Sequence, residues 1–124
     1  MSINDCKLFE LPKISDERGR MGVVESTRHL PFEIKRLFYL YSVAPQQTRG
    51  AHAHNQLHQF LISIAGEFQV ELDDGKQKKT ILLNNPHAGL HVPPLHWCTV
   101  KNFSSDAVCL VLASDFYDES DYYL

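Results

Sequence analysis

Short runs of β-branched and aromatic residues recur along this chain, and turn residues separate each run from the next. We predict strands over residues 21–25, 34–43, 59–64, 67–72, 79–83, 89–92, 99–102 and 107–113. Between two of these runs, Asp74-Gly75 predicts a tight turn, because Asp and Gly tolerate the positive φ that such turns need. No segment of helical length shows a helical period. The pattern predicts an all-β fold, a sandwich or a barrel, with a jelly roll as the favoured form.

The length and charge of the chain limit what it can be. A length of 124 residues leaves room for one domain, which we expect to cover residues 1–124. Its acidic and aromatic end, residues 114–124, is expected to form a flap or an interface segment. The net charge is −3, with acidic and basic residues scattered along the chain. This distribution gives no electrostatic argument for binding nucleic acid or an anionic membrane.

The sequence also favours a cytoplasmic protein. No apolar run approaches the roughly 20 residues that cross a bilayer. Residues 1–10 lack the basic start and the apolar stretch of a signal peptide. Cys6, Cys98 and Cys109 are an odd number of cysteines without a CxxC pair, so we expect reduced thiols.

The most informative stretch for chemistry is Arg49-Gly50-Ala51-His52-Ala53-His54. Histidines two positions apart on a strand point to the same face, and the Ala and Gly residues around them leave space there. Imidazole has an unperturbed pKa of about 6.5, which suits proton transfer at neutral pH. We therefore predict that His52 and His54 act on a substrate with Arg49 beside them. The alternative is that both histidines are structural or exposed.

A pair of histidines in this pattern also raises the question of a metal. Metal sites built on HxH in jelly-roll proteins add a carboxylate a few residues later and a final histidine from a later strand. Here Gln59 stands at the carboxylate position and Cys98 stands at the position of the final histidine. We predict no metal and no other cofactor. A zinc or iron site made of His52, His54 and Cys98 stays open as an alternative.

Two further stretches carry candidate binding residues. Asp16-Glu17-Arg18-Gly19-Arg20 is either a charged turn or a place where Arg18 binds a phosphate through paired hydrogen bonds. In the run 34–43, alternation places Leu37, Tyr39 and Tyr41 on one face and Arg36, Phe38 and Leu40 on the other. The sequence does not say which set faces the interior, and core packing is the favoured role for these aromatic residues. The other histidines that we considered have no partner at useful spacing, and we expect them to be structural or exposed. They are His58, His87, His91 and His96.

Taken together, several motifs resemble those of the dTDP-4-keto-6-deoxyglucose 3,4-ketoisomerases, sugar-modifying members of the cupin superfamily. The shared stretches are DERG, PFEIKRLFYLY, RGAHAH, HQFLISIAGEFQVELDDG, GLHVPP followed by Trp97, and LVLASDFYDESDY, which span most of the chain. The resemblance implies a jelly-roll barrel, a homodimer with strands exchanged between subunits, and no metal. It also implies that His52 and His54 are the acid/base pair, with Arg49 beside them.

The resemblance further implies a substrate, a dTDP-linked 4-keto-6-deoxyhexose. Proton transfer through an enediolate would give the 3-keto sugar, for a deoxy or deoxyamino sugar of a lipopolysaccharide, O-antigen or S-layer glycan. The residues that we expect to bind substrate are Arg18, Arg36, Phe38, Tyr39, Gln59, Trp97 and Cys98.

Two positions depart from the family pattern. The family has Trp-His where this chain has Trp97-Cys98, and often Tyr-Tyr where it has Phe38-Tyr39. These departures leave open the configuration at C4 of the product. A more distant resemblance to the 3,5-epimerases of dTDP-rhamnose synthesis rests on the same Arg49-Gly50-x-His52 pattern. The alternatives to a ketoisomerase are such an epimerase, a metal-dependent cupin, and a cupin that binds a nucleotide sugar without catalysis.

Overall fold

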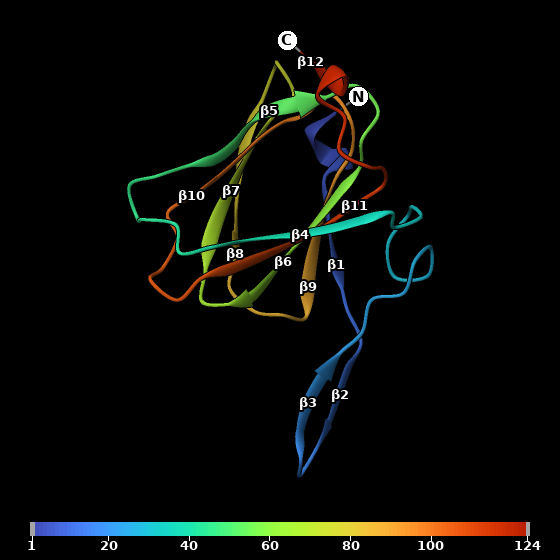
Figure 1. Ribbon diagram of the computed structural model, residues 1–124, viewed down its shortest axis with the longest axis vertical. Coiled ribbons are helices and arrows are strands. Elements are labelled where there is room, and N and C mark those ends of the chain that lie inside the picture. The colour runs from blue at the N-terminus through green and yellow to red at the C-terminus, as the bar shows by residue number, and fades with distance from the viewer. Residues whose placement is uncertain (1, 124) are drawn as a thin grey trace.

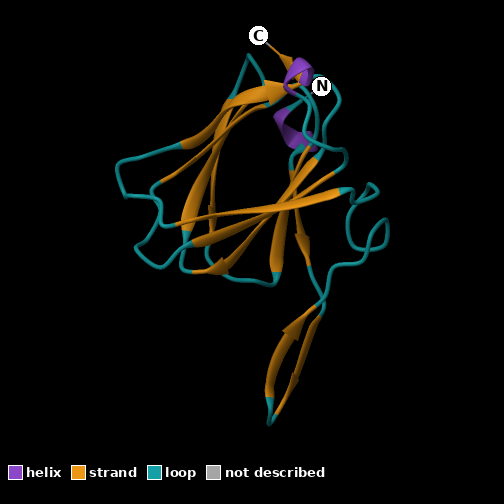
Figure 2. Ribbon diagram, in the orientation of Figure 1, coloured by secondary structure: helices purple, strands orange, loops and turns teal. Residues whose placement is uncertain are grey.

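The computed structural model describes residues 2–123, and two facing antiparallel sheets make up most of it (Figures 1 and 2). One sheet has the strand order β1-β9-β6-β11-β4, and the other has the order β12-β5-β10-β7-β8. The strands are β1 (Lys7–Glu10), β2 (Lys13–Asp16), β3 (Gly19–Gly22), β4 (Arg36–Tyr41), β5 (Arg49–His54), β6 (Gln59–Ala65), β7 (Phe68–Asp73), β8 (Lys78–Leu83), β9 (Ala88–Val92), β10 (Trp97–Lys101), β11 (Val108–Ala113) and β12 (Tyr122–Tyr123). Two short 3₁₀ helices, η1 (Ile3–Asp5) and η2 (Glu119–Asp121), complete the described chain. The predicted all-β jelly roll is confirmed.

The space between the two sheets is filled by alternate side chains of their strands. In β7, Phe68, Val70 and Leu72 are fully buried in this core, while the residues between them are half-buried. Burying a side chain of this size contributes about 1.5–3 kcal/mol. Apolar and polar residues alternate in the same way in the sequence of this stretch. The side chains of β7 therefore point to the two faces of the sheet as that alternation indicates.

Strand β6 is buried on both faces, which explains its nearly continuous apolar sequence. Leu61 packs in the core between the sheets. Phe60 and Ile62 point to the other face and pack against Leu30 and Phe32, from the loop between β3 and β4. This loop therefore covers part of the outer surface of the first sheet.

The turns agree only partly with those predicted. Asp74-Gly75 joins β7 to β8 in an antiparallel pair, as expected, and Gly75 has φ = 92°. A turn at Ala65-Gly66, for which no partner strand was predicted, carries the chain from β6 in one sheet to β7 in the other. The strand predicted over 21–25 was wrong in its second half, because β3 ends at Gly22 and the chain then leaves to form the covering loop. Strands β1, β2 and β12 were not predicted, and β5 was not among the predicted runs, although a strand was assumed for His52 and His54.

Strands β2 and β3 form a hairpin that projects away from the two sheets (Figure 1). All eight of its strand residues are exposed, including the apolar side chains of Ile14 and Met21. The chain ends lie near the opposite end of the molecule, beside β5 and β12 (Figure 1). Within residues 2–123, no helix has the length and apolar character needed to span a membrane.

Candidate active site

A bulge in β5 positions the two histidines. The strand pairs with β10, and its register shifts between Cys98 and Thr99, where Gly50 and Ala51 both have positive φ (81° and 60°). A Cβ atom on Gly50 would lie 2.8 Å from the carbonyl oxygen of Cys98, so glycine is required there by space as well as by φ. Beyond the bulge, His52 and His54 both face the same cavity.

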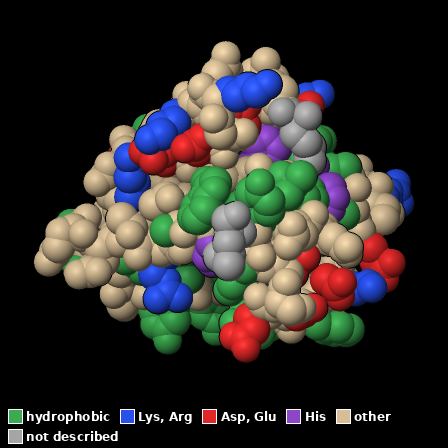
Figure 3. All heavy atoms as spheres, turned by 90° about the horizontal axis from the view of Figure 1, so that it is seen from above, with side chains coloured by type: hydrophobic (Ala, Val, Ile, Leu, Met, Phe, Trp, Pro, Cys, Tyr) green, Lys and Arg blue, Asp and Glu red, His purple; other side chains and the backbone are tan. Residues whose placement is uncertain are grey.

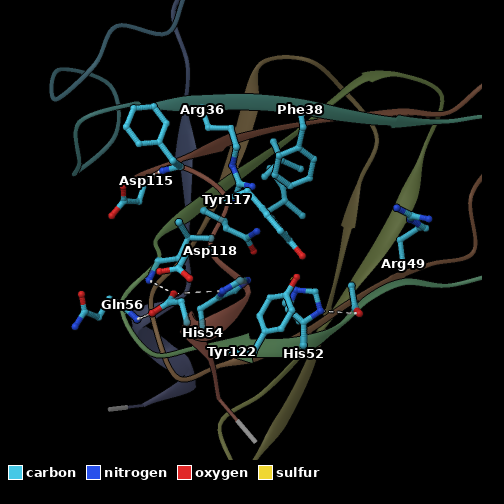
Figure 4. A pocket seen from close by; sticks show the side chains of 18 of the residues that line it. Arg36, Phe38, Arg49, His52, His54, Gln56, Asp115, Tyr117, Asp118 and Tyr122 are labelled. Carbon is cyan, nitrogen blue, oxygen red and sulfur yellow. Dashed lines mark hydrogen bonds and ion pairs between the residues drawn. The ribbon is translucent and has the colours of Figure 1, made fainter.

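This cavity has a volume of about 340 Å³, within the range of small-molecule sites. Figure 4 shows Arg36 and Phe38 on β4 facing His52 and His54 on β5, with Tyr117 between the two walls. Seen from above, the face beside the chain ends has hydrophobic and histidine side chains at its centre, with charged side chains around them (Figure 3).

Most of the predicted site residues meet in this cavity. Those that line it are Arg36, Phe38, Arg49, His52, His54, Gln59 and Cys98. The alternation of β4 is now resolved, because Arg36, Phe38 and Leu40 face inward while Leu37, Tyr39 and Tyr41 are exposed.

Three predicted binding residues lie outside the cavity of this chain. Arg18 is at the turn of the β2–β3 hairpin, 86% exposed, and pairs with Asp16 at 2.7 Å. Tyr39 is on the outer face of β4, where its ring packs against that of Tyr41 with centroids 5.7 Å apart. Trp97 is 37% exposed at the start of β10, while the next residue, Cys98, points inward. Alternation along β4 and β10 separates each of these aromatic residues from the cavity.

His52 has a well-defined partner within its own strand. Its Nδ1 lies 3.0 Å from the carbonyl oxygen of Gly50, which can only accept a hydrogen bond. Nδ1 therefore carries the hydrogen, and the neutral ring has its lone pair on Nε2. The ring of His52 meets that of His54 edge to face, with centroids 4.9 Å apart.

The side chain of His54 is largely buried and faces a carboxylate. Burial and the neighbouring His52 lower its pKa, while Asp121 acts in the opposite direction. The Asp121 carboxylate lies 3.4 Å from Nδ1 of His54, and the two side chains are only 17% and 11% exposed. The ring of Tyr122 covers both histidines, with centroids 4.4 Å from His52 and 5.0 Å from His54.

Arg36 brings a positive charge to the opposite wall. Its guanidinium lies over the rings of Phe38 and Tyr117, 5.2 Å and 5.6 Å from their centroids. Its Nε is buried and has no hydrogen-bond partner within residues 2–123. A buried donor without an acceptor costs free energy, so this atom is available for an anionic or carbonyl oxygen of a ligand.

The sequence did not identify the residues of the C-terminal segment that complete the cavity. These are Asp115, Phe116, Tyr117, Asp118, Asp121 and Tyr122. The segment was singled out as acidic and aromatic, but its contacts depend on β12 pairing with β5, with Tyr122 opposite His54. A two-residue strand carries too little periodicity to be recognised in a sequence.

Cys98 is a neutral thiol in this cavity. Burial raises its pKa to about 12, so the thiolate that binds metals is disfavoured. Cys6 and Cys109 are also free and buried. Among residues 2–123, no three His, Cys, Asp or Glu side chains are arranged to hold a metal ion.

Comparisons with known proteins identify the family of this chain. The model of a family described as WxcM-like, C-terminal (FdtA) matches residues 4–124. A TDP-4-oxo-6-deoxy-α-D-glucose-3,4-oxoisomerase of Aneurinibacillus thermoaerophilus is 43% identical over 116 residues, which are 94% of this chain and 84% of that protein.

Solved structures are similar over nearly the whole chain. The TDP-quinovose 3,4-ketoisomerase WlaRB of Campylobacter jejuni is 45% identical with a TM-score of 0.92, covering 97% of this chain and 92% of its own. A variant of the 3,4-ketoisomerase QdtA of Thermoanaerobacterium thermosaccharolyticum, in complex with TDP-4-keto-6-deoxyglucose, is 38% identical with a TM-score of 0.94. That match covers 99% of this chain and 88% of QdtA.

Proposed function

We propose, from the premise that this chain belongs to the WxcM-like, C-terminal family, that it is a 3,4-ketoisomerase of a nucleotide-linked sugar. Its substrate is dTDP-4-keto-6-deoxyglucose, and its product is a dTDP-3-keto-6-deoxyhexose for the synthesis of a deoxy or deoxyamino sugar. The ligand of the similar QdtA variant and the name of the Aneurinibacillus relative support this substrate.

The reaction consists of proton transfers alone. The hydrogen on C3 is acidic because the neighbouring C4 carbonyl takes up the charge as an enediolate. A base removes that hydrogen, O4 gains a proton as O3 loses one, and C4 receives a proton. The product is an isomer, and the face of C4 that receives the proton decides between the gluco and galacto configurations.

The observation that carries the proposal is the hydrogen bond from Nδ1 of His52 to the carbonyl oxygen of Gly50. It fixes a tautomer whose free lone pair, on Nε2, can accept a proton from carbon. His52 is therefore the base at C3. His54, with its ring centroid 4.9 Å from that of His52, moves the proton between O3 and O4.

Arg36 stabilises the enediolate in this account. Its buried and unpartnered Nε faces the histidine wall across the cavity (Figure 4). A positioned donor in a site with little water is often the largest contribution to catalysis of this kind. Arg49 is exposed at the edge of the cavity and binds the diphosphate.

The protein also forms a homodimer with exchanged strands. Leu37, Tyr39 and Tyr41 expose between 53% and 63% of their surface on β4, an edge strand. Ile14 and Met21 are similarly exposed on the projecting β2–β3 hairpin. Apolar surface of this extent is typical of an interface. If the hairpin packs on the partner subunit, Arg18 at its turn can reach a substrate bound there.

The three cysteines are free thiols, which supports a cytoplasmic location.

The test is incubation of the purified protein with dTDP-4-keto-6-deoxyglucose, followed by proton NMR of the product and elemental analysis of the protein. We expect a 3-keto sugar with unchanged configuration at C5 and no stoichiometric metal. Inversion at C5 would indicate a 3,5-epimerase instead. Bound but unchanged substrate would indicate a nucleotide-sugar-binding protein, and one zinc or iron per active chain would indicate a metal-dependent enzyme.

A further inference from the structure

The strongest unassigned feature of the site is Asp121, at the end of η2. Its carboxylate accepts hydrogen bonds from the backbone N–H groups of Gln56 (3.0 Å) and Leu57 (3.1 Å). Its backbone carbonyl accepts from the N–H of Asn55 at 2.7 Å and from the amide side chain of the same residue at 3.2 Å. Asp121 thus forms hydrogen bonds with the three residues that directly follow His54.

These contacts orient the carboxylate toward His54. Oδ2 of Asp121 lies 3.4 Å from Nδ1 of His54, slightly beyond a typical N–H···O hydrogen bond, so the contact is mainly electrostatic. Catalytic hydrogen bonds are often long in free enzymes and shorten when the substrate binds. Neither ring nitrogen of His54 has a hydrogen-bond partner in the described part of the chain.

Nδ1 of each histidine therefore has a different neighbour. Nδ1 of His52 meets a neutral carbonyl, whereas Nδ1 of His54 meets an anion. The anion stabilises an imidazolium more strongly than the neutral carbonyl does. The other groups around His54 are His52 and Arg36, which lower its pKa, and the ring of Tyr122. Burial has the largest effect on the pKa of His54 and lowers it, and Asp121 opposes this effect. His54 is thus the ring of the pair that has a carboxylate beside it, and different surroundings can give similar groups different roles.

We propose that Asp121 is a positioning residue that holds His54 with Nδ1 toward the carboxylate and Nε2 toward the cavity, making His54 the proton donor of the pair. This inference rests on the proposed function and deepens it. When the C4 carbonyl becomes an enediolate, protonated His54 gives its Nε2 proton to O4. The neutral ring then takes the proton of O3, and Asp121 keeps its own charge throughout.

The test compares Asp121→Asn with Asp121→Glu and with the control Asp74→Asn. Asp74 likewise accepts hydrogen bonds from several backbone N–H groups, at the turn between β7 and β8, and does not line the cavity. We expect Asp121→Asn to lower kcat about 10- to 100-fold, as loss of a histidine's orienting partner typically does. KM should change far less, Asp121→Glu should recover part of kcat because it keeps the anion, and Asp74→Asn should match the wild type.

A second readout separates positioning from a structural role. We expect the alkaline limb of the kcat–pH profile and the NMR titration of His54 both to move to lower pH in Asp121→Asn, because the imidazolium loses its counter-charge. An unchanged His54 titration, or an equal loss of kcat in Asp74→Asn, would overturn the proposal. The titration needs no turnover. A protein inactive on the keto sugar therefore contradicts the proposed function, while the titration still decides the role of Asp121.

Discussion

His52 and His54 lie two positions apart on one strand, yet the groups that face Nδ1 of each ring differ. A backbone carbonyl fixes the tautomer of His52, and a carboxylate faces His54. Identical side chains can therefore take different parts in one reaction, because each protonation state is set by what the ring touches rather than by its residue type. The spacing of the pair could be read in the sequence, whereas these partners depend on the fold.

A second histidine pair, His58 and His91, does not line the cavity and is expected to affect stability. Nδ1 of His58 lies 2.9 Å from Nε2 of His91, and the rings stack with centroids 5.2 Å apart beside Phe32. Burial, followed by the neighbouring His58 and His96, lowers the pKa of His91 to about 4. The folded protein thus keeps His91 neutral at a pH where the unfolded chain binds a proton.

We therefore predict that the free energy of unfolding falls as the pH drops from 6.5 to 4, by about 3 kcal/mol from His91 alone. The sign follows because the unfolded state binds more protons across this window. Urea unfolding at several pH values measures the slope. His91→Gln should reduce the slope, whereas an equal slope in His91→Gln would contradict the prediction.

At the scale of elements, strand β5 shows which structural features could be predicted from the sequence and which could not. Alternation correctly predicted that His52 and His54 share a face, and the regular alternation of β7 marked a half-buried strand. The bulge at Gly50 and Ala51 could not be predicted, because it depends on the register with β10. The placement of Tyr39 was undecided for a similar reason, since alternation defines two faces of a strand but not which one is inside.

We predict that Gly50→Ala impairs both stability and activity. The added Cβ would meet the Cys98 carbonyl oxygen at 2.8 Å in a residue with φ = 81°, and moving β5 away would displace His52. Strain of this kind costs about 1–3 kcal/mol. The control is Gly75→Ala, which also has positive φ but has nothing within 4 Å of its Cβ.

Thermal unfolding and steady-state kinetics separate the two variants. Gly75→Ala should lose some stability and retain kcat, while Gly50→Ala should lose both. Wild-type kcat in a folded Gly50→Ala protein would mean that the close approach of β5 to β10 does not position His52.

At the scale of the whole molecule, β5 and β12, which carry His52, His54 and Tyr122 of the cavity lining, lie toward the opposite end from the projecting hairpin (Figure 1). The exposed apolar residues of β4 lie on the outer face of the strand whose inner face carries Arg36 and Phe38. One strand therefore serves the cavity on one side and the proposed interface on the other. This arrangement lets the interface be altered without replacing a residue of the cavity.

We predict that Tyr39→Glu converts the dimer to a monomer, because it places a charge in the apolar surface of β4. Sedimentation velocity measures the change. The control is Leu82→Glu, a similarly exposed apolar residue on β8 in the other sheet, which should remain dimeric. If Arg18 reaches the partner's substrate, Tyr39→Glu should also raise KM more than it lowers kcat. A monomeric wild type, or a dimeric Tyr39→Glu, would contradict the proposed interface.

The central claim, that His52 removes the proton from C3 and C4 then receives a proton that exchanges with solvent, is tested most directly by isotope incorporation. dTDP-4-keto-6-deoxyglucose is incubated in D₂O with the wild type or with His52→Asn, and proton NMR follows the signals of H3, H4 and H5. For the wild type, we predict a 3-keto product with deuterium at C4 and hydrogen retained at C5. His52→Asn should be slower by about 10²- to 10⁴-fold, the usual cost of losing a positioned base. Wild-type rates in a folded His52→Asn, or deuterium at C5, would contradict the account.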